Sequence, residues 1–175
     1  MNKFSKKVIA AVVSLSAIGC LSPAWAQQPL KFAGQDVSPW AVHEKNSGAL
    51  SGIFVDLTNA VAKDAGLPVQ YELMTFADLI PALTSGKIDV IATEMAITPA
   101  RAEQVDFSNP VYNPPKEAVV VSASDKTAYR SLADLNNMTV GVQKGSIQLA
   151  LLQQTGGFNE MKIYDTVQET WSAVA

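Results

Sequence analysis

Arg101 is the residue whose type and position point most clearly to chemistry. It follows Thr98, a suitable N-cap, and Pro99, which suits the first position of a helix. Arg101 would then lie in the first helical turn, where the helix dipole disfavours a cation by roughly 0.3–1 kcal/mol. A bound anion would remove this conflict, because a guanidinium and the free N–H groups of a helix start both bind carboxylates. The spacing equally allows a surface salt bridge to Glu103 or Asp106, and both interpretations stay open.

A second helix start, in the run Lys144-Gly145-Ser146, repeats this pattern later in the chain. Gly145 permits a close backbone approach and Ser146 can cap the helix. Two helix N-termini can converge on one carboxylate, although a plain helix cap explains the same residues.

Two aromatic residues, Trp40 and Phe76, are candidates for stacking on a ligand because each follows a predicted strand. Trp40 lies in a polar loop after Pro39, where burial in a core is not obvious. Phe76 could equally make a hydrophobic contact inside the fold.

Residues of the common enzyme and metal sites are mostly absent. His43 is the sole histidine, which excludes metal sites built on paired histidines, and its polar loop is more typical of a solvated side chain than of a catalytic one. The chain has no G-x-S-x-G, Walker or G-x-G-x-x-G motif. We therefore expect a binding protein with no catalytic residue, metal or cofactor.

The elements that must position these residues alternate between strands and helices. A helix over 52–65 would bury Phe54, Leu57, Val61 and Ala65, and Gly66 would end it. A capping box at Thr75 predicts a helix over 75–85, and the segment 36–50 is predicted to be a loop. Strands are expected at 30–34, 69–73, 89–93 (buried on both faces), 116–122, 139–142 and 162–164. Further helices are expected from 98, over 131–135, over 146–154 and from about 166.

This alternation predicts an α/β fold with parallel sheets. Ligands bind such sheets at the carboxyl ends of the strands, so we expect the site in the loops after Gly34, Leu73 and Thr93. The pattern restarts after residue 121, which predicts a first lobe over 27–112, a hinge crossover over 113–121 and a second lobe over 122–175. The last helix has neither a C-cap signal nor a following strand, so we expect the second lobe to be incomplete and the fragment to bind weakly.

Residues 1–26 have the layout of a secretory signal peptide: three lysines, an apolar stretch and Ala24-Trp25-Ala26 as the cleavage site. Cleavage after Ala26 would change the net charge from -3 to -6, because the segment contains three lysines and no acid. A lipoprotein anchored at Cys20 is the less favoured alternative, since Cys20 lacks a large aliphatic residue three positions earlier.

Composition narrows the class of partner. Hydrophobic residues make up 48% of the chain and charged residues 17%, as in a packed globular protein. No basic patch interleaved with aromatic residues occurs, so nucleic acid is not an expected partner.

Five motifs, in order, carry a family resemblance: 52–57 (GIFVDL), 76–83 (FADLIPAL), 86–90 (GKIDV), 97–101 (ITPAR) and 105–108 (VDFS). Together with 132–135 and 140–142 they resemble the family 3 extracellular solute-binding proteins, the polar amino-acid receptors of ABC importers. The resemblance implies a type II periplasmic-binding fold, a monomer whose two lobes close around a small amino-acid-like ligand, and a membrane permease as partner.

The resemblance also implies roles for individual residues. Arg101 would clamp the α-carboxylate of the ligand, assisted by the Ala96 N–H and the helix start at Ser146–Ile147. Thr93 and Glu94 would face the ligand ammonium, Phe76 would pack on its side chain, and Gln143 would line the wall of the second lobe. The first-loop aromatic residue of the family falls at Val37 here, with Trp40 three residues later.

Glu94 and Ala96 depart from the family pattern, which often has a small residue and a hydroxyl there. A carboxylate at Glu94 would favour a cationic group on the ligand.

Two alternative functions stay open at this point. One is an enzyme similar to cyclohexadienyl (arogenate or prephenate) dehydratases, with Glu94 as the acid, and the other is the sensor domain of a larger membrane protein.

Overall fold

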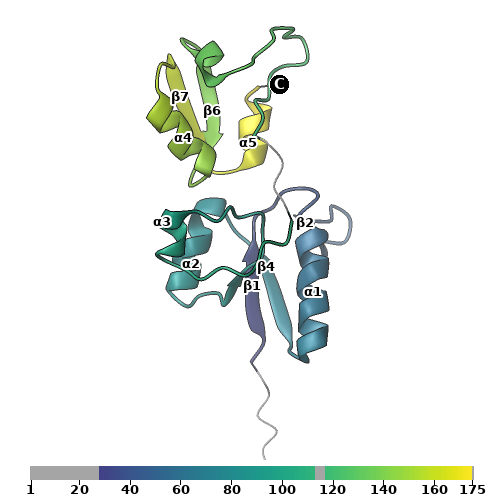
Figure 1. The fold of residues 1–175 in the computed structure, drawn as a ribbon. Helices are drawn as coiled ribbons and strands as arrows, with labels where there is room; N and C mark the ends of the chain where they lie inside the picture. Colours follow the sequence, from purple (N-terminus) through teal and green to yellow (C-terminus); the bar gives the residue numbers. More distant parts are fainter. Residues whose placement is uncertain (1–27, 113–116, 175) are drawn as a thin grey trace, which may run out of the picture.

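A computed structural model describes residues 28–112 and 117–174, which form two α/β lobes placed end to end (Figure 1). The first lobe contains a parallel sheet in the order β4-β1-β5, made of β4 (Val69–Leu73), β1 (Leu30–Gly34) and β5 (Val90–Ile91). The second lobe contains a parallel pair, β6 (Thr139–Gln143) and β7 (Glu160–Tyr164). The prediction of an α/β fold with mostly parallel sheets is confirmed.

One layer of helices covers each face of the first sheet. Helix α1 (Ile53–Ala65) ends at Gly66, whose left-handed conformation (φ 67°) caps it as predicted. On the other face, the 3-10 turn η1 (Phe76–Asp78) and helix α2 (Leu79–Thr84) pack on the sheet. The core on this side contains Ala33, Phe76, Leu79, Ala82 and Ile88. Helix α3 (Pro99–Ala102) follows β5.

The second lobe has the same plan. The 3-10 turn η2 (Leu132–Leu135) precedes β6, and helices α4 (Ile147–Thr155) and α5 (Val167–Ser172) follow β6 and β7. Leu135, Val140, Val142 and Leu152 form its buried core. Because each parallel strand is followed by a helix, the chain re-enters the sheet in the same direction, as in other βαβ units.

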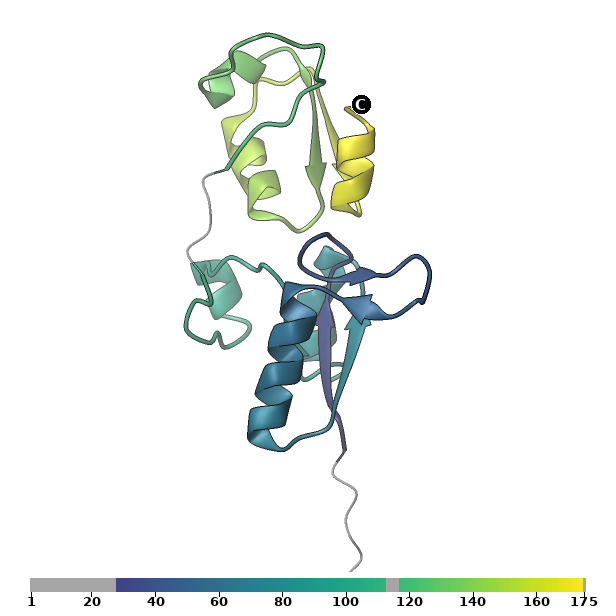
Figure 2. The same cartoon turned by 90° about the vertical axis from the view of Figure 1, so that its right-hand side faces the viewer.

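The segment 36–50 is not the plain loop that its polar composition predicts. Val37 bridges Ala41, and β2 (Val42–His43) pairs antiparallel with β3 (Leu50–Ser51). Val37 and Ala41 are buried, and two-residue strands are too short for the alternation of side chains to be recognisable in the sequence. Figure 2 shows this hairpin at the end of the first lobe that faces the second.

Helix α1 uses a different face from the one predicted. Its buried residues are Phe54, Val55, Thr58 and Ala62, whereas Val61 is 50% exposed and Ala65 is exposed. Small side chains allow a helix to approach a sheet closely. Thr58 and Ala62 therefore lie at the contact, which a pattern based on large apolar residues misses.

The capping box predicted at Thr75 does not form. The Thr75 hydroxyl donates to the Asp78 carboxylate (2.6 Å) instead of accepting a backbone N–H, and the helix begins as a 3-10 turn.

Two predicted strands also differ. Strand β5 covers only Val90–Ile91 and is half-buried, because in the described residues it pairs with β1 alone. In the predicted strand 116–122, the described residues 117–122 form no strand. Val119 and Val120 are exposed there, because no neighbouring strand supplies backbone partners. The signal peptide and residues 113–116 of the predicted hinge lie outside the described residues.

Candidate functional site

Arg101 is buried where the two lobes meet. Thr98 caps helix α3 as predicted, its hydroxyl accepting from the Arg101 N–H at 3.3 Å. The guanidinium donates through Nη1 to the Ala96 carbonyl (2.7 Å) and through Nη2 to the Gly145 carbonyl of the second lobe (3.0 Å). It also lies 5.4 Å from the centre of the Phe76 ring. These contacts fix the guanidinium from both lobes.

The charge of Arg101 has no carboxylate counterpart in the part of the chain that the structure describes. The side chain is only 8% exposed, and neither Glu103 nor Asp106 forms an ion pair with it there. Burial lowers the pKa of Arg101, yet an arginine stays cationic at neutral pH. A guanidinium has five N–H donors, so the two carbonyl contacts leave donors for an anion. The surface salt bridge that the sequence left open is absent among these residues.

The turn between β6 and α4 supplies the part of the site from the second lobe. A side chain at Gly145 (φ 75°) would lie 3.2 Å from the Ala77 Cα, so glycine lets the lobes approach closely here. Ser146 caps α4: its hydroxyl accepts from the Leu149 N–H (3.1 Å) and donates to the Gln143 carbonyl (2.7 Å). Ile147 begins the helix and is half-buried.

A chain of hydrogen bonds joins Glu94 to the second lobe. The half-buried Glu94 carboxylate accepts from the Thr93 hydroxyl (2.7 Å) and from the Gln35 side-chain amide (2.5 Å). The Gln35 carbonyl oxygen in turn accepts from the Gln143 amide at 2.8 Å. Gln35 follows β1 directly and Glu94 follows β5 closely, so both lie at the carboxyl ends of strands.

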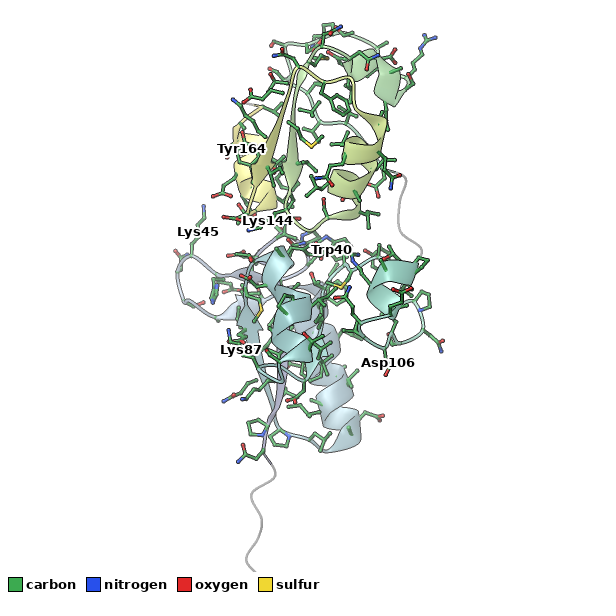
Figure 3. All side chains as sticks on the ribbon, turned by 90° about the vertical axis from the view of Figure 1, so that its left-hand side faces the viewer. Trp40, Lys45, Lys87, Asp106, Lys144 and Tyr164 are labelled. Carbon is green, nitrogen blue, oxygen red and sulfur yellow. The ribbon has the colours of Figure 1, made fainter. Side chains whose placement is uncertain are left out.

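Three aromatic rings of the first lobe pack together. Trp40 stacks on Tyr112 (5.5 Å between ring centres, 18° between planes) and packs against Phe54 at 5.8 Å. Burial, and next the charge of Glu94, raise the pKa values of Tyr71 and Tyr112. Figure 3 shows Trp40 and Lys144 at the junction of the lobes, with Lys87 and Asp106 further from it.

The structure brings most of the predicted site residues to this junction. Arg101, Phe76 and Gly145 meet on one side, and Thr93, Glu94 and Gln143 are joined on the other. Ala96 contributes its carbonyl to Arg101, whereas the prediction used its N–H. Val37 is buried (4% exposed) and its backbone bridges Ala41.

Sequence reasoning missed Gln35 and Tyr112. Gln35 follows the first strand at its carboxyl end, a position that could have identified it. Tyr112 carries no such signal, because its stacking on Trp40 arises only in the folded chain.

A groove lies elsewhere, along the flank of the first sheet. It has a volume of about 520 Å³ and is lined by Lys31, Phe32, Gln70, Tyr71, Glu72 and Lys87. The hydrogen-bonded groups at the lobe junction do not open into it, so we place the candidate site at the junction.

Residues 32–172 match the family model of bacterial extracellular solute-binding proteins, family 3. The chain belongs to this family. The resemblance seen in the sequence is therefore confirmed over most of the chain, and the members of the family are extracellular or periplasmic binding proteins rather than enzymes.

Named relatives of this family 3 protein bind amino acids. The arginine-binding extracellular protein ArtP of Bacillus subtilis is 33% identical over 85% of this chain and 58% of its own length. The ABC transporter arginine-binding protein 1 of Escherichia coli is 27% identical over 95% of this chain and 65% of its own length. The chain thus spans less than two thirds of the length of both.

Solved structures of amino-acid-binding proteins have a similar fold. An ancestral arginine-binding protein bound to arginine is 34% identical with a TM-score of 0.72, covering 85% of this chain and 66% of its own. An ancestral amino-acid-binding protein described as a precursor of cyclohexadienyl dehydratase is 29% identical with a TM-score of 0.76, covering 83% of this chain and 65% of its own. That precursor is itself an amino-acid-binding protein, so the dehydratase alternative gains no support from it.

Among the residues that the structure describes, no helix combines the length and apolar character needed to cross a bilayer.

Proposed function

We propose that this family 3 protein captures an amino acid, or a related small molecule with an amine and a carboxylate, between its two lobes. It hands this ligand to the membrane permease of an ABC importer. The observation that carries the proposal is Arg101: a buried guanidinium at the lobe junction, without a carboxylate partner in the described residues and contacted from both lobes. A buried cation in such a setting is stabilised by an anion.

In this proposal Arg101 binds the ligand α-carboxylate, and the free N–H groups at the Ser146–Ile147 helix start face the same anion. Thr93 and Glu94 face amino groups, and Ala96 holds the guanidinium in place through its carbonyl. The ring of Phe76 lies against the Arg101 guanidinium and also packs on the ligand. Gln143, Trp40 and the loop at Val37 line the remaining walls.

We further propose that the protein works as a periplasmic monomer, exported by a signal peptide cleaved after Ala26, with a lipid anchor at Cys20 as the less favoured arrangement. The proposed units are a first lobe over 27–112, a hinge over 113–121 and a second lobe over 122–175. Support comes from the sequence layout of residues 1–26 and from the family, whose members act outside the cytoplasm.

Isothermal titration calorimetry tests the ligand class. The protein, expressed from its complete coding sequence, is titrated with each of the twenty amino acids, beginning with arginine because several relatives are named for it. We expect saturable one-to-one binding of at least one amino acid. Absence of binding across the set would contradict the proposal.

A further inference from the structure

The hydroxyl of Tyr71 crosses the first sheet to reach the chain just after β5. Tyr71 lies on β4, and its hydroxyl donates to the Ala92 carbonyl at 2.5 Å. Because β1 lies between β4 and β5, this bond ties the two outer strands together over the central one. Burial raises the pKa of Tyr71, so the hydroxyl keeps its proton and remains a donor near neutral pH.

Gly34, the last residue of β1, makes this crossing possible. Tyr71 pairs with Phe32, two residues before Gly34, so the tyrosine ring lies on the face that Gly34 leaves empty. A Cβ at Gly34 would lie only 2.7 Å from the Ala92 carbonyl oxygen and would overlap the Tyr71 hydroxyl. A glycine inside a strand is typical of such a close approach.

The bond from Tyr71 holds the start of residues 92–96, which we call the binding segment. Strand β5 pairs with β1 over two residues only, and the Ala92 N–H then donates to the Ala33 carbonyl at 2.8 Å. Among the described residues, the backbone bonds of the segment to the sheet end there. The next one, from the Met95 N–H to the Thr93 carbonyl (2.8 Å), is internal to the segment. Ala92 is therefore the backbone anchor of the segment, and Tyr71 supplies one of its two bonds.

The binding segment carries the side chains and the carbonyl that the proposed function uses. Its far end, the Ala96 carbonyl, accepts from Nη1 of Arg101 at 2.7 Å. Thr93 and Glu94 lie between and are bonded to each other. The internal bond folds these residues into a compact turn, so a displacement of the Ala92 carbonyl also displaces Ala96 and the guanidinium it holds. Binding groups need such support to stay in a productive geometry.

We propose that Tyr71 is a positioning residue for ligand binding, whose hydroxyl holds the binding segment in the geometry that Arg101 and Glu94 require. Tyr71 acts through Ala92 and not by contacting the ligand. This inference rests on the proposed function and adds to it a determinant of affinity on the far strand of the sheet.

The test compares Tyr71→Phe with Tyr129→Phe in the protein expressed from its complete coding sequence. Tyr129 is the matched control, because it is also half-buried and its hydroxyl donates to the Asp125 carboxylate (2.8 Å) within the second lobe. Each substitution removes one hydroxyl and one hydrogen bond, so both should lower the thermal unfolding midpoint by a similar few degrees.

The two variants should differ in affinity. Calorimetry uses L-arginine, or the amino acid that wild type binds best. Tyr71→Phe should weaken binding by about 5- to 10-fold, whereas Tyr129→Phe should stay within about twofold of wild type. Equal losses of stability with unequal losses of affinity would separate positioning from a purely structural role.

Amide hydrogen exchange of the ligand-free protein gives a second readout. The N–H groups of the binding segment, Ala92 first, should exchange faster in Tyr71→Phe than in wild type and should be unchanged in Tyr129→Phe. Gly34→Ala displaces the hydroxyl without removing it, so it should reproduce both the faster exchange and the weaker binding.

Three results would overturn the inference and leave the proposed function intact. They are an affinity of Tyr71→Phe within about twofold of wild type, an equal loss of affinity in Tyr129→Phe, and unchanged exchange of the Ala92 N–H in Tyr71→Phe. Failure of wild type to bind any amino acid would instead reject the proposed function, and the role of Tyr71 in binding with it.

Discussion

At the scale of single residues, two charges organise the lobe junction. Arg101 and Glu94 are each held by neutral groups, the first by the carbonyls of Ala96 and Gly145 and the second by Thr93 and Gln35. Opposite charges that are fixed separately, rather than paired with each other, match a ligand that itself carries both charges. Pairing them directly would cancel the field that recognises such a ligand.

The pKa of Tyr112, which the charge of Glu94 helps to raise, provides a measurement without any ligand. Burial, and then the charge of Glu94, hold the pKa of Tyr112 above its ordinary value of 10.0. Glu94→Gln removes the charge and leaves the burial, so we expect the Tyr112 pKa to fall but to stay above 10.0. NMR titration of 13C-labelled tyrosine, assigned with Tyr112→Phe, measures it. An unchanged Tyr112 pKa in Glu94→Gln would mean that the two groups are not neighbours in solution.

At the scale of elements, the strands and helix starts were the most predictable features. β1, β4 and the caps at Thr98, Ser146 and Thr166 follow from apolar runs and from side chains that accept helix N–H groups. The hairpin at β2 and β3, the face of α1 and the missing strand at 117–122 were not predictable. The hairpin pairs segments that are close in sequence, but its two-residue strands are too short to show an alternation of side chains. The face of α1 and the missing strand depend on contacts with segments distant in sequence, which no local pattern records.

The candidate site also has one part that the sequence predicts and one that it does not. Arg101 was identifiable because a cation in the first turn of a helix conflicts with the helix dipole. The connection from Glu94 through Gln35 to Gln143 was not, because glutamine side chains have no preferred position in a sequence pattern and the three residues come from separate elements.

The turn before β6 gives a pH-dependent prediction. The backbone N–H groups of Arg130 and Ser131 both donate to the Asp134 carboxylate (2.7 and 2.8 Å) and hold its pKa below the ordinary value of 3.8. A depressed pKa in the folded state means that the ionised carboxylate stabilises the fold. This stabilisation is present above pH 3.8 and is lost as the pH falls through the lower, folded-state pKa.

Chemical denaturation at several pH values, together with NMR titration of the carboxyl groups, measures this contribution. Asp134→Asn should lower stability near neutral pH and should flatten the acid limb of the stability profile. An Asp134 pKa at or above 3.8 would contradict the hydrogen-bonded turn. Glu103→Gln, at an exposed position in the first lobe, serves as the control.

At the scale of the whole molecule, the contacts between lobes are mostly hydrogen bonds. Gln143 to Gln35, Arg101 to Gly145 and Gln168 to the Asp36 carbonyl cross the junction, and Gly145 lies against Ala77. Polar contacts exchange with water at little net cost in free energy, whereas a packed apolar interface resists opening. The junction is therefore suited to open for a ligand and to close on it.

In the proposed function, closure around a ligand would couple Arg101 to the second lobe. A ligand carboxylate bound by Arg101 would also meet the start of α4, so its binding energy would favour the state in which the lobes are together. If Arg101 binds the ligand carboxylate, as proposed, its replacement removes the discrimination between a ligand and its uncharged amide. A purely structural role of Arg101 would not produce this loss.

The most direct measurement is calorimetry with the best-bound amino acid and its α-carboxamide, on wild type, Arg101→Met and Arg130→Met. Arg130 is the only other arginine and is exposed in the second lobe. Wild type and Arg130→Met should prefer the free acid by about 100-fold, and Arg101→Met should bind both forms weakly and with similar affinity. A folded Arg101→Met protein that keeps the preference for the free acid would contradict the claim.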